Sequence, residues 1–343
     1  MEKESEVIVE AKNVKTYFPV AHNQVVKAVD GVSLTLYKGE TYGLVGETGC
    51  GKSTFGRTLI RLQTPSEGTI KVKGKDISTA PEKKMGDLRK QMQMVFQDPY
   101  TSLNPRIRVG DMLMEVLQIH KIGKSKSEKM AIAMEIMEKV GLRTEHFYRY
   151  PHEFSGGQRQ RIGLARALIL NPEIIICDEP VSALDVSIQS QIINLFLDLQ
   201  ETEDLTYLFI AHDISVVKYI SNRIGVMYLG HLVEEATAED LFNHPLHPYT
   251  QALLSAVPEA NPHRTGKQRI MLKGDLPSPI SPPSGCVFRT RCPYSSMLCE
   301  DLEPLSIPVG PEKEHTVACH MYLNKYYNKS GVSIEAKGKE VVS

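Results

Sequence analysis

The stretch that decides the fold is GETGCGKS, residues Gly46–Ser53, which fits the pattern G-x-x-x-x-G-K-[ST]. In such a loop the glycines let the backbone curl, so that its N–H groups point at phosphate oxygens. The lysine reaches the β- and γ-phosphates, and the serine hydroxyl binds Mg²⁺. A strand pattern over 40–45 precedes the loop and a helix pattern follows it, which distinguishes it from a chance glycine turn. We therefore expect the nucleotide phosphates and Mg²⁺ to be held by Gly46, Glu47, Thr48, Gly49, Cys50, Gly51, Lys52, Ser53 and Thr54.

A second signal is the segment IIICDE, in which Asp178 and Glu179 follow an apolar run. Open α/β sheets bind their ligands at the carboxyl ends of such buried strands. Asp178 would hold Mg²⁺ directly or through water, and Glu179 would act as the general base on the attacking water. The alternative is a pair of carboxylates that merely leaves the strand for solvent. The phosphate loop earlier in the chain favours the catalytic interpretation.

The patterning along the chain predicts an α/β fold. Residues 5–46 alternate like strands, residues 98–142 have helical periodicity, and the apolar runs EIIIC and TYLFIA are separated by a helical stretch. Apolar runs separated by helices are typical of a parallel sheet covered on both faces. After about Glu235 the composition becomes proline-rich, which predicts a linker into a small appendage. The expected parts are a first core and β region 1–97, a helical region 98–164, a second core region 165–240, a cysteine-containing extension 241–328 and a disordered tail 329–343.

Bulk composition narrows the class of protein. The 343 residues carry 40 Lys plus Arg and 41 Asp plus Glu, a net charge of −1, so the basic excess of a nucleic-acid binder is missing. The N-terminal segment is charged and has no apolar signal core, and no apolar run approaches the roughly 18 residues of a membrane span. We expect a cytosolic chain that borrows any membrane part from a partner.

The segment FSGGQRQR, Phe154–Arg161, closely resembles the signature of ABC-type ATPases, whose first residue is more often Leu. The phosphate loop, the signature, the Asp-Glu pair, SALD and AHD occur in the order that this family shows. The resemblance implies an ABC-type nucleotide-binding domain. Its parts would be a RecA-like parallel-sheet core, an N-terminal antiparallel β subdomain and a helical subdomain. It also implies ATP as the nucleotide and ATP hydrolysis as the activity.

The resemblance implies roles for further residues. Gln97 corresponds to the Q-loop glutamine, which joins Ser53 and Asp178 as an Mg²⁺ ligand, and His212 to the switch histidine that acts with Glu179 and Gln97 in catalysis. Phe18 occupies the place of the aromatic that stacks on adenine, with Tyr17 as the less favoured alternative. A last set would act in trans, on the ATP of a partner in a head-to-tail dimer: Ser155, Gly156, Gly157, Gln158 and, from the D-loop, Asp185. ATP binding would close such a dimer, and hydrolysis would release it.

Three kinds of ABC protein compete at this point: a transporter ATPase, a non-transport ATPase and a regulatory module without hydrolysis. The presence of Lys52, Glu179 and His212 disfavours the last, and a single module with near-zero net charge disfavours the second. VFQDPYTSLNPR, Val95–Arg106, resembles the Q-loop region of dipeptide, oligopeptide and nickel importers. LFNHPLHPYTQALLSAVP and LPSPISPPSGCVFRTRCP resemble the C-terminal extension of that subfamily.

This closer resemblance implies a peptide-importer ATPase at the cytoplasmic face of the membrane. Its partners would be a second ATPase subunit, two membrane subunits and, indirectly, an external binding protein. The pair of ATPases would be a heterodimer or a homodimer. The solute stays open among dipeptides, oligopeptides, nickel and certain glycosides.

Four of the six cysteines lie in the extension, spaced C-x₅-C-x₆-C-x₁₉-C: Cys286, Cys292, Cys299 and Cys319. A reducing compartment disfavours disulfides, and separate packing roles are a second possibility. Four thiolates could also ligate zinc or an iron–sulfur cluster, although zinc favours tighter C-x₂₋₄-C pairs. The resemblance implies a 4Fe–4S cluster on these residues, with Zn²⁺ as the alternative. Cys50 and Cys177 need no role beyond packing.

Overall fold

The computed structural model describes residues 6–21, 23–81, 83, 85–257, 269–310 and 314–323. The tail that the sequence predicts to be disordered, 329–343, lies outside these residues. Within the described part of the chain, none of the helices combines the length and the apolar composition that a membrane span requires.

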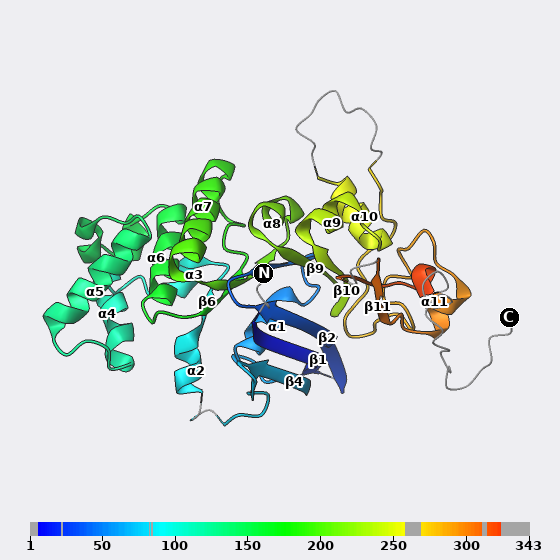
Figure 1. The fold of residues 1–343 in the computed structure, drawn as a ribbon, viewed down its shortest axis with the longest axis horizontal. Coiled ribbons are helices and arrows are strands. Elements are labelled where there is room, and N and C mark those ends of the chain that lie inside the picture. Colours follow the sequence, from blue (N-terminus) through cyan, green and yellow to red (C-terminus); the bar gives the residue numbers. More distant parts are fainter. Residues whose placement is uncertain are drawn as a thin grey trace.

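Strands and helices alternate along most of the chain (Figure 1). The strands are β1 (Val7–Val20), β2 (Gln24–Tyr37), β3 (Thr41–Val45), β4 (Glu67–Val72), β5 (Lys75–Asp76), β6 (Met92–Val95), β7 (Ile174–Asp178), β8 (Thr206–Ala211), β9 (Arg223–Tyr228), β10 (His231–Thr237), β11 (Ser306–Val309) and β12 (His315–Ala318). The helices are α1 (Lys52–Leu59), α2 (Gly86–Gln91), α3 (Pro99–Ser102), α4 (Val109–Ile119), α5 (Lys126–Lys139), α6 (Gly156–Leu168), α7 (Val186–Glu203), α8 (Ile214–Ile220), α9 (Ala238–Asn243), α10 (Pro248–Ser255) and α11 (Met297–Asp301), with 3₁₀ turns η2 (Thr144–Tyr148) and η3 (Pro151–Glu153).

The central sheet has eight strands in the order β11-β12-β10-β9-β3-β8-β7-β6. Strands β9, β3, β8, β7 and β6 run parallel to one another, as the uninterrupted apolar runs predict. The register pairs Val45 with Ala211 and Val95 with Cys177, so the carboxyl ends of these strands lie at one edge. The loops that follow β3, β6, β7 and β8 therefore meet in space.

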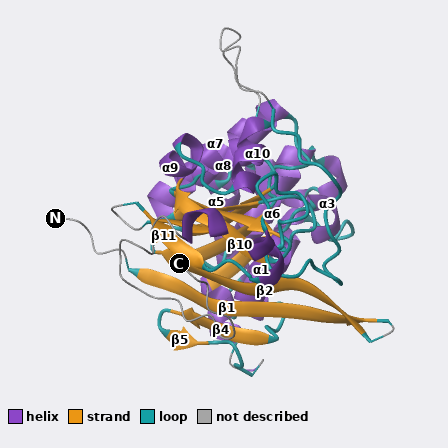
Figure 2. Cartoon of the chain, turned by 90° about the vertical axis from the view of Figure 1, so that its right-hand side faces the viewer, coloured by secondary structure: helices purple, strands orange, loops and turns teal. Residues whose placement is uncertain are grey.

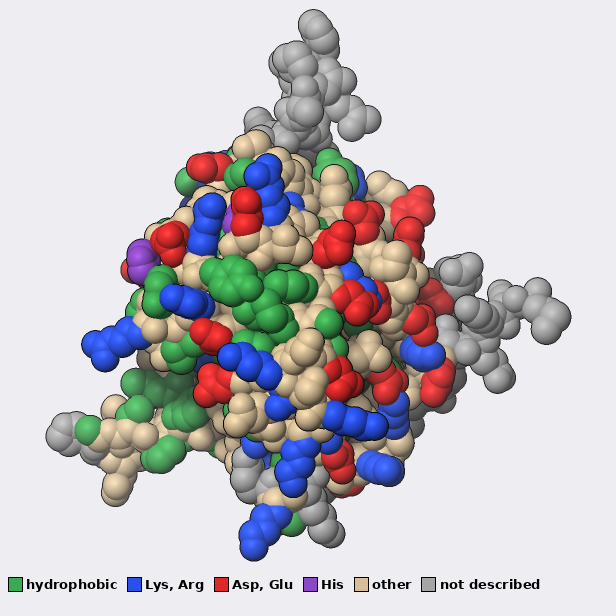
Figure 3. All heavy atoms as spheres, turned by 90° about the vertical axis from the view of Figure 1, so that its left-hand side faces the viewer, with side chains coloured by type: hydrophobic (Ala, Val, Ile, Leu, Met, Phe, Trp, Pro, Cys, Tyr) green, Lys and Arg blue, Asp and Glu red, His purple; other side chains and the backbone are tan. Residues whose placement is uncertain are grey.

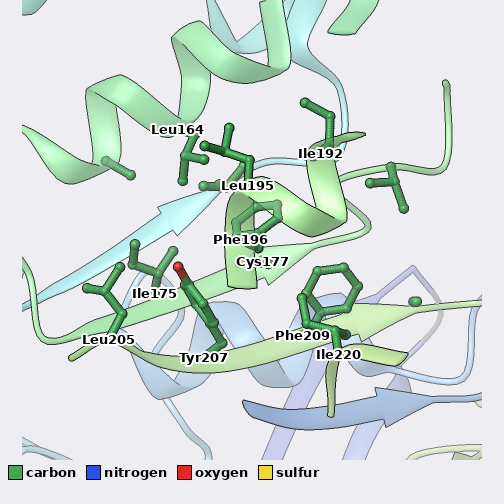
Figure 4. Close-up of a cluster of buried hydrophobic side chains, with 14 of the residues drawn as sticks. Leu164, Ile175, Cys177, Ile192, Leu195, Phe196, Leu205, Tyr207, Phe209 and Ile220 are labelled. Atoms are coloured by element: carbon green, nitrogen blue, oxygen red, sulfur yellow. The ribbon is translucent and has the colours of Figure 1, made fainter. Parts of the chain in front are cut away.

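One face of this sheet is packed against α6 and α7 (Figure 4). Phe196 of α7 meets Tyr207 and Phe209 of β8 edge-on, with ring centroids 5.4 and 5.8 Å apart. Leu164 of α6 and Ile175 of β7 are buried in the same core. Edge-on aromatic pairs contribute about 0.5–1.5 kcal/mol beyond the area that they bury, so this layer fixes β7 and β8 firmly beneath the helices.

A second, antiparallel sheet has the order β2-β1-β4-β5 and forms a separate layer (Figure 2). Its apolar side chains, such as Val9 and Leu36, share one core with Phe55 of α1 and Leu44 of β3. Helix α1 is thus held between the two sheets, and the loop before α1 is held with it.

Helices α4 and α5 project to one side of the central sheet (Figure 1). Residues 98–142, for which the sequence predicts helical periodicity, include α4, which is buried at Val109, Met112, Leu113 and Leu117. On α5, Ala133 and Met137 are buried, while Met130 and Met134 pack partly against the same core. The methionines of this region are therefore packing residues.

The C-terminal residues pack directly on the core. Strand β12 pairs antiparallel with β10 through Glu234 and Val317, so the extension continues the central sheet. Glu234 is buried and accepts hydrogen bonds from the backbone N–H groups of Leu246 (2.7 Å) and His247 (2.9 Å) and from His315 Nε2 (2.7 Å). One carboxylate thus satisfies three donors and joins α10 and β12 to the core. Four-residue strands such as β11 and β12 carry too little alternation to be predicted from sequence.

Candidate nucleotide site

The phosphate loop, Gly46–Ser53, leaves β3 and enters α1 with a conformation that its glycines permit. Gly51 has φ 104°, and a Cβ there would lie 2.0 Å from the carbonyl oxygen of Ala28. Gly49 has φ 82°, and a Cβ there would meet nothing within 4 Å. Both φ values disfavour L side chains, and the open space beside Gly49 leaves its backbone accessible to a ligand.

Lys52 lies inside the curve of the loop, with 3% of its surface exposed. Its Nζ donates to the carbonyl oxygens of Gly46 (2.8 Å) and Glu47 (3.1 Å) and lies 4.0 Å from Glu179 Oε1. Two carbonyl oxygens of the loop thus accept hydrogen bonds from this ammonium group. Phosphate oxygens entering the loop would compete with these carbonyls for the same charge.

Ser53 of α1 meets Asp178 at the end of β7. The Ser53 hydroxyl donates to Asp178 Oδ1 at 2.6 Å, and Arg57 Nη2 lies 3.5 Å from Oδ2. Burial raises the pKa of the Asp178 carboxyl, while Ser53 and Arg57 partly offset this shift. A hydroxyl and a carboxylate are ligands that Mg²⁺ prefers, so the pair suits the role predicted for it.

Glu179 follows β7 in the left-handed region, with φ 46°, and is buried. Gln97 Nε2 donates to Glu179 Oε2 at 2.9 Å, and His212 Nδ1 lies 3.1 Å from the same oxygen. Because a carboxylate only accepts, the proton of that second bond is on Nδ1. The three residues predicted to act in catalysis thus converge from the ends of β6, β7 and β8. Gln97, also predicted as an Mg²⁺ ligand, contacts Glu179 rather than Ser53 or Asp178.

The segments predicted to act in trans are organised differently. Ser155 caps α6: its Oγ accepts from Gln158 N at 3.4 Å, and Gln158 Oε1 accepts from Ser155 N at 3.0 Å. Gly157 lies against Ile188, which a Cβ would approach to 2.5 Å. Asp185 precedes α7 and is exposed. In the described ranges, no hydrogen bond or ion pair joins these residues to the phosphate loop, and their action in trans stays a prediction.

The two candidate adenine-stacking residues are adjacent on β1. The Tyr17 hydroxyl donates to Asp30 Oδ1 at 2.5 Å, and burial together with this bond raises the pKa of Tyr17. Phe18 pairs with Val26 across the hairpin and is half-buried. Neighbouring strand residues project to opposite faces of the sheet. Tyr17 is therefore hydrogen-bonded to Asp30 on one face of the sheet, and Phe18 projects from the opposite face. Stacking by Phe18 stays a prediction.

Sequence reasoning missed two residues that contact the loop. The Tyr249 hydroxyl accepts a hydrogen bond from Glu47 N at 2.8 Å, and Arg291 Nη1 lies 2.8 and 3.1 Å from the two carboxylate oxygens of Glu47. Glu47 is 202 residues from Tyr249 and 244 residues from Arg291 in the sequence, so no local motif predicts these contacts. Burial alone would lower the pKa of the Arg291 guanidinium, but its interactions with Glu47 and Tyr228 raise it.

The four cysteines of the extension all have free thiols, so the disulfide interpretation is wrong. Burial raises the pKa of Cys286 and of Cys319 to about 11, and the neighbouring thiols add to this shift. Among the described residues, however, no group of three His, Cys, Asp or Glu side chains converges as a metal site. Cys50 and Cys177 are buried, as packing residues are.

Comparison with known proteins identifies the class. The family described as ABC transporter matches residues 29–182, and the family described as oligopeptide/dipeptide transporter, C-terminal region, matches residues 233–299. A solved dimer of the ATP-binding cassette MJ0796 in a post-hydrolysis state, bound to ADP and Pi, superposes with a TM-score of 0.62 at 27% identity. It covers 67% of this chain and 99% of that one. The fold and the site define an ATP-binding cassette ATPase, which confirms the predicted fold class and activity.

Curated relatives identify the family. The oligopeptide transport ATP-binding protein AppF of Bacillus subtilis is 54% identical over 327 residues, 92% of this chain and 98% of the relative. The protein OppF of Salmonella typhimurium, also named for oligopeptide transport, is 48% identical over 326 residues, 92% of this chain and 97% of that protein. The chain belongs to the family of oligopeptide and dipeptide transport ATP-binding proteins.

Proposed function

We propose that this chain binds and hydrolyses ATP to power the import of dipeptides or oligopeptides across the cell membrane. The observation that carries the ATPase assignment is the convergence of Lys52, Gln97, Glu179 and His212 at one sheet edge, beside the Ser53–Asp178 pair. The names of the relatives support peptides as the solute over the alternatives of nickel or another small solute. A non-transport ATPase is a weaker alternative, because the C-terminal family match is to transporters.

In the nucleotide-bound state we assign the phosphates to the N–H groups of the phosphate loop and to Lys52. Lys52 Nζ would then give up its hydrogen bonds to the carbonyl oxygens of Gly46 and Glu47. Phe18 would stack on the adenine. Ser53 and Asp178, with Gln97, would hold Mg²⁺, whose chemistry is to neutralise charge on the phosphates. Glu179 takes a proton from the attacking water, and His212 keeps the Glu179 carboxylate oriented through the bond at 3.1 Å.

The second half of each site comes from a partner ATPase. Ser155 opens α6, where the N–H groups of Gly156 and Gly157 and the positive end of the helix are suited to a γ-phosphate, with Gln158 as the further residue proposed to act there. Asp185 is exposed, and 78% of the surface of Val186 beside it is exposed. This surface supports a head-to-tail pair that closes on two ATP molecules. The partner would be a second, different ATPase subunit or another copy of this chain.

A groove of about 470 Å³ separates the helical region from the core. Its apolar lining comes from both parts: Ile60, Leu62, Met92, Met94, Phe96, Val116, Ile119, Ala167 and Leu170. Figure 3 looks at the side of the molecule from which the helical region projects and shows hydrophobic side chains gathered among charged ones. Gln97 follows Phe96, so the residue that contacts Glu179 is next to the groove. We assign this groove to a short cytoplasmic helix of a membrane subunit, and propose that the chain works at the cytoplasmic face of the membrane.

The cysteines of the extension are proposed to hold a 4Fe–4S cluster, with Zn²⁺ as the alternative. Four of the six cysteines lie within residues 286–319, and their thiols are free, which supports this proposal. The raised pKa of Cys286 and Cys319 keeps these thiols protonated without metal, so metal binding would release protons. Anaerobically purified protein should contain about four irons per chain and absorb broadly near 400 nm. Stoichiometric zinc without iron would refute the cluster.

The identity of the solute is tested by purifying the intact complex of ATPase, membrane and binding-protein subunits. Mass spectrometry of the released ligand should find short peptides. Nickel alone, or no solute together with undiminished ATPase activity, would contradict the peptide assignment.

A further inference from the structure

Glu47, the second residue of the phosphate loop, is held from outside the ATPase core at two points. Its N–H donates to the Tyr249 hydroxyl at 2.8 Å, and its carboxylate lies 2.8 and 3.1 Å from Arg291 Nη1. Tyr249 belongs to α10, and Arg291 stands immediately before Cys292. The described extension thus contacts both the backbone and the side chain of one loop residue.

The groups that make these contacts are rigidly packed. The rings of Tyr228, Tyr249 and Phe288 form a closed aromatic cluster, with centroids 4.8, 5.1 and 5.5 Å apart. Phe288 is 1% exposed and Tyr249 fully buried. The Arg291 side chain is 10% exposed, and its guanidinium lies 5.9 Å from the Tyr228 ring centroid.

The same short segment carries two of the cysteines. Cys286 N donates to Cys299 O at 2.8 Å, and Arg291 N donates to Phe288 O at 3.0 Å. Residues 286–292, here called the clamp segment, are therefore one folded unit that ends on the phosphate loop.

Charge explains what the clamp segment does for the loop. ATP brings several negative charges to a loop that already carries the Glu47 carboxylate, and like charges at such distances repel. Arg291 neutralises this carboxylate and holds it to one side, while Tyr249 fixes the direction of the N–H group. Without Arg291, the carboxylate would be free to oppose the phosphates.

We propose that Arg291 and Tyr249 are positioning residues that hold the phosphate loop ready for MgATP, so that the order of the clamp segment sets nucleotide affinity. This inference rests on the proposed function, because it requires the loop to bind ATP. Coupling between two sites is reciprocal. MgATP must therefore stabilise the clamp segment in return.

The first test measures the Kd of a fluorescent ATP analogue with Mg²⁺ for the full chain. Arg291→Ala should weaken binding by about fivefold or more, the lower range of coupling between sites, and Arg291→Lys should restore part of it. Arg143→Ala is the control for the loss of an arginine, since Arg143 pairs with Glu145 in the helical region, outside the clamp segment. In the double variant Glu47→Ala/Arg291→Ala most of the affinity should return. A double variant as weak as Arg291→Ala alone would overturn the electrostatic argument.

The second test measures hydrogen exchange of residues 286–292 with and without MgATP. Wild type should exchange more slowly with nucleotide, and Arg291→Ala should lose this difference at a saturating concentration. No slowing in a wild type that binds MgATP would overturn the proposal, whereas a wild type that fails to bind MgATP would refute the proposed function itself.

Discussion

The substitution Glu179→Gln separates binding from hydrolysis. Glu179 Oε2 accepts from Gln97 at 2.9 Å and from His212 at 3.1 Å, and an amide oxygen at the same place can accept both bonds. The size and the hydrogen bonding of the side chain are therefore kept. The basicity is lost, and a positioned general base contributes about 10²- to 10⁴-fold in rate. At about 1.36 kcal/mol per tenfold, this raises the barrier by about 3–5 kcal/mol.

The assay is phosphate release by the chain paired with its native partner, together with ATP retention on the assembled dimer. We expect turnover to fall by about 10² or more, with ATP retained in a closed dimer. Glu203→Gln is the matched control, because Glu203 pairs with Lys139 away from the site. Turnover of Glu179→Gln within threefold of wild type would show that another group activates the water, and the assignment of Glu179 would be wrong.

Three further predictions address binding, packing and pH. Lys52→Ala should abolish tight MgATP binding in equilibrium titrations, since the mobile cation inside the loop is gone; unchanged affinity would remove the phosphate-loop assignment. Gly51→Ala should weaken MgATP binding and lower the melting temperature, because the new Cβ would lie 2.0 Å from Ala28 O. Gly74→Ala is the control: its Cβ would have no atom within 4 Å, so MgATP affinity should stay unchanged. Burial lowers the pKa of His247 to about 4 from 6.5, so its contribution to stability is present above pH 6.5 and is lost as pH falls toward 4. At pH 5 this loss is about 2 kcal/mol, and in chemical denaturation His247→Asn, which can still cap Tyr249 N, should reduce the loss between pH 6.5 and 5. An identical pH slope in the two proteins would contradict the burial argument.

What could be predicted from sequence is what local patterns encode. Asp178 ends β7, His212 follows β8, and Lys52 begins the helix after the loop that leaves β3; parallel strands bring such ends to one edge. The convergence of Glu179 with Gln97 and His212 was thus implied by the topology. The left-handed backbone conformation of Glu179 could not be predicted, because the residue is neither the glycine nor the asparagine that usually adopts it.

The remainder depends on pairings across long stretches of sequence. Arg291 contacts Glu47 from 244 residues away in the sequence, and an arginine or a glutamate alone does not predict which partner it will have. Strand β12 joins β10 because a buried Glu234 satisfies donors from both sides, a packing result that a four-residue run of HTVA does not encode. The resemblance implies metal ligands at the four cysteines, but it does not encode the aromatic cluster of Phe288, Tyr228 and Tyr249 beside them.

The central claim is that ATP hydrolysis by this chain drives peptide import, and uptake by the reconstituted complex tests it most directly. Proteoliposomes are prepared with the ATPase subunits facing the bath, the peptide-loaded binding protein inside, and MgATP supplied outside. Labelled peptide should then leave the lumen only with ATP, and Glu179→Gln in both ATPase subunits should reduce the rate to that without nucleotide. Peptide movement at the same rate without ATP, or ATP hydrolysis that moves no peptide, would contradict the account.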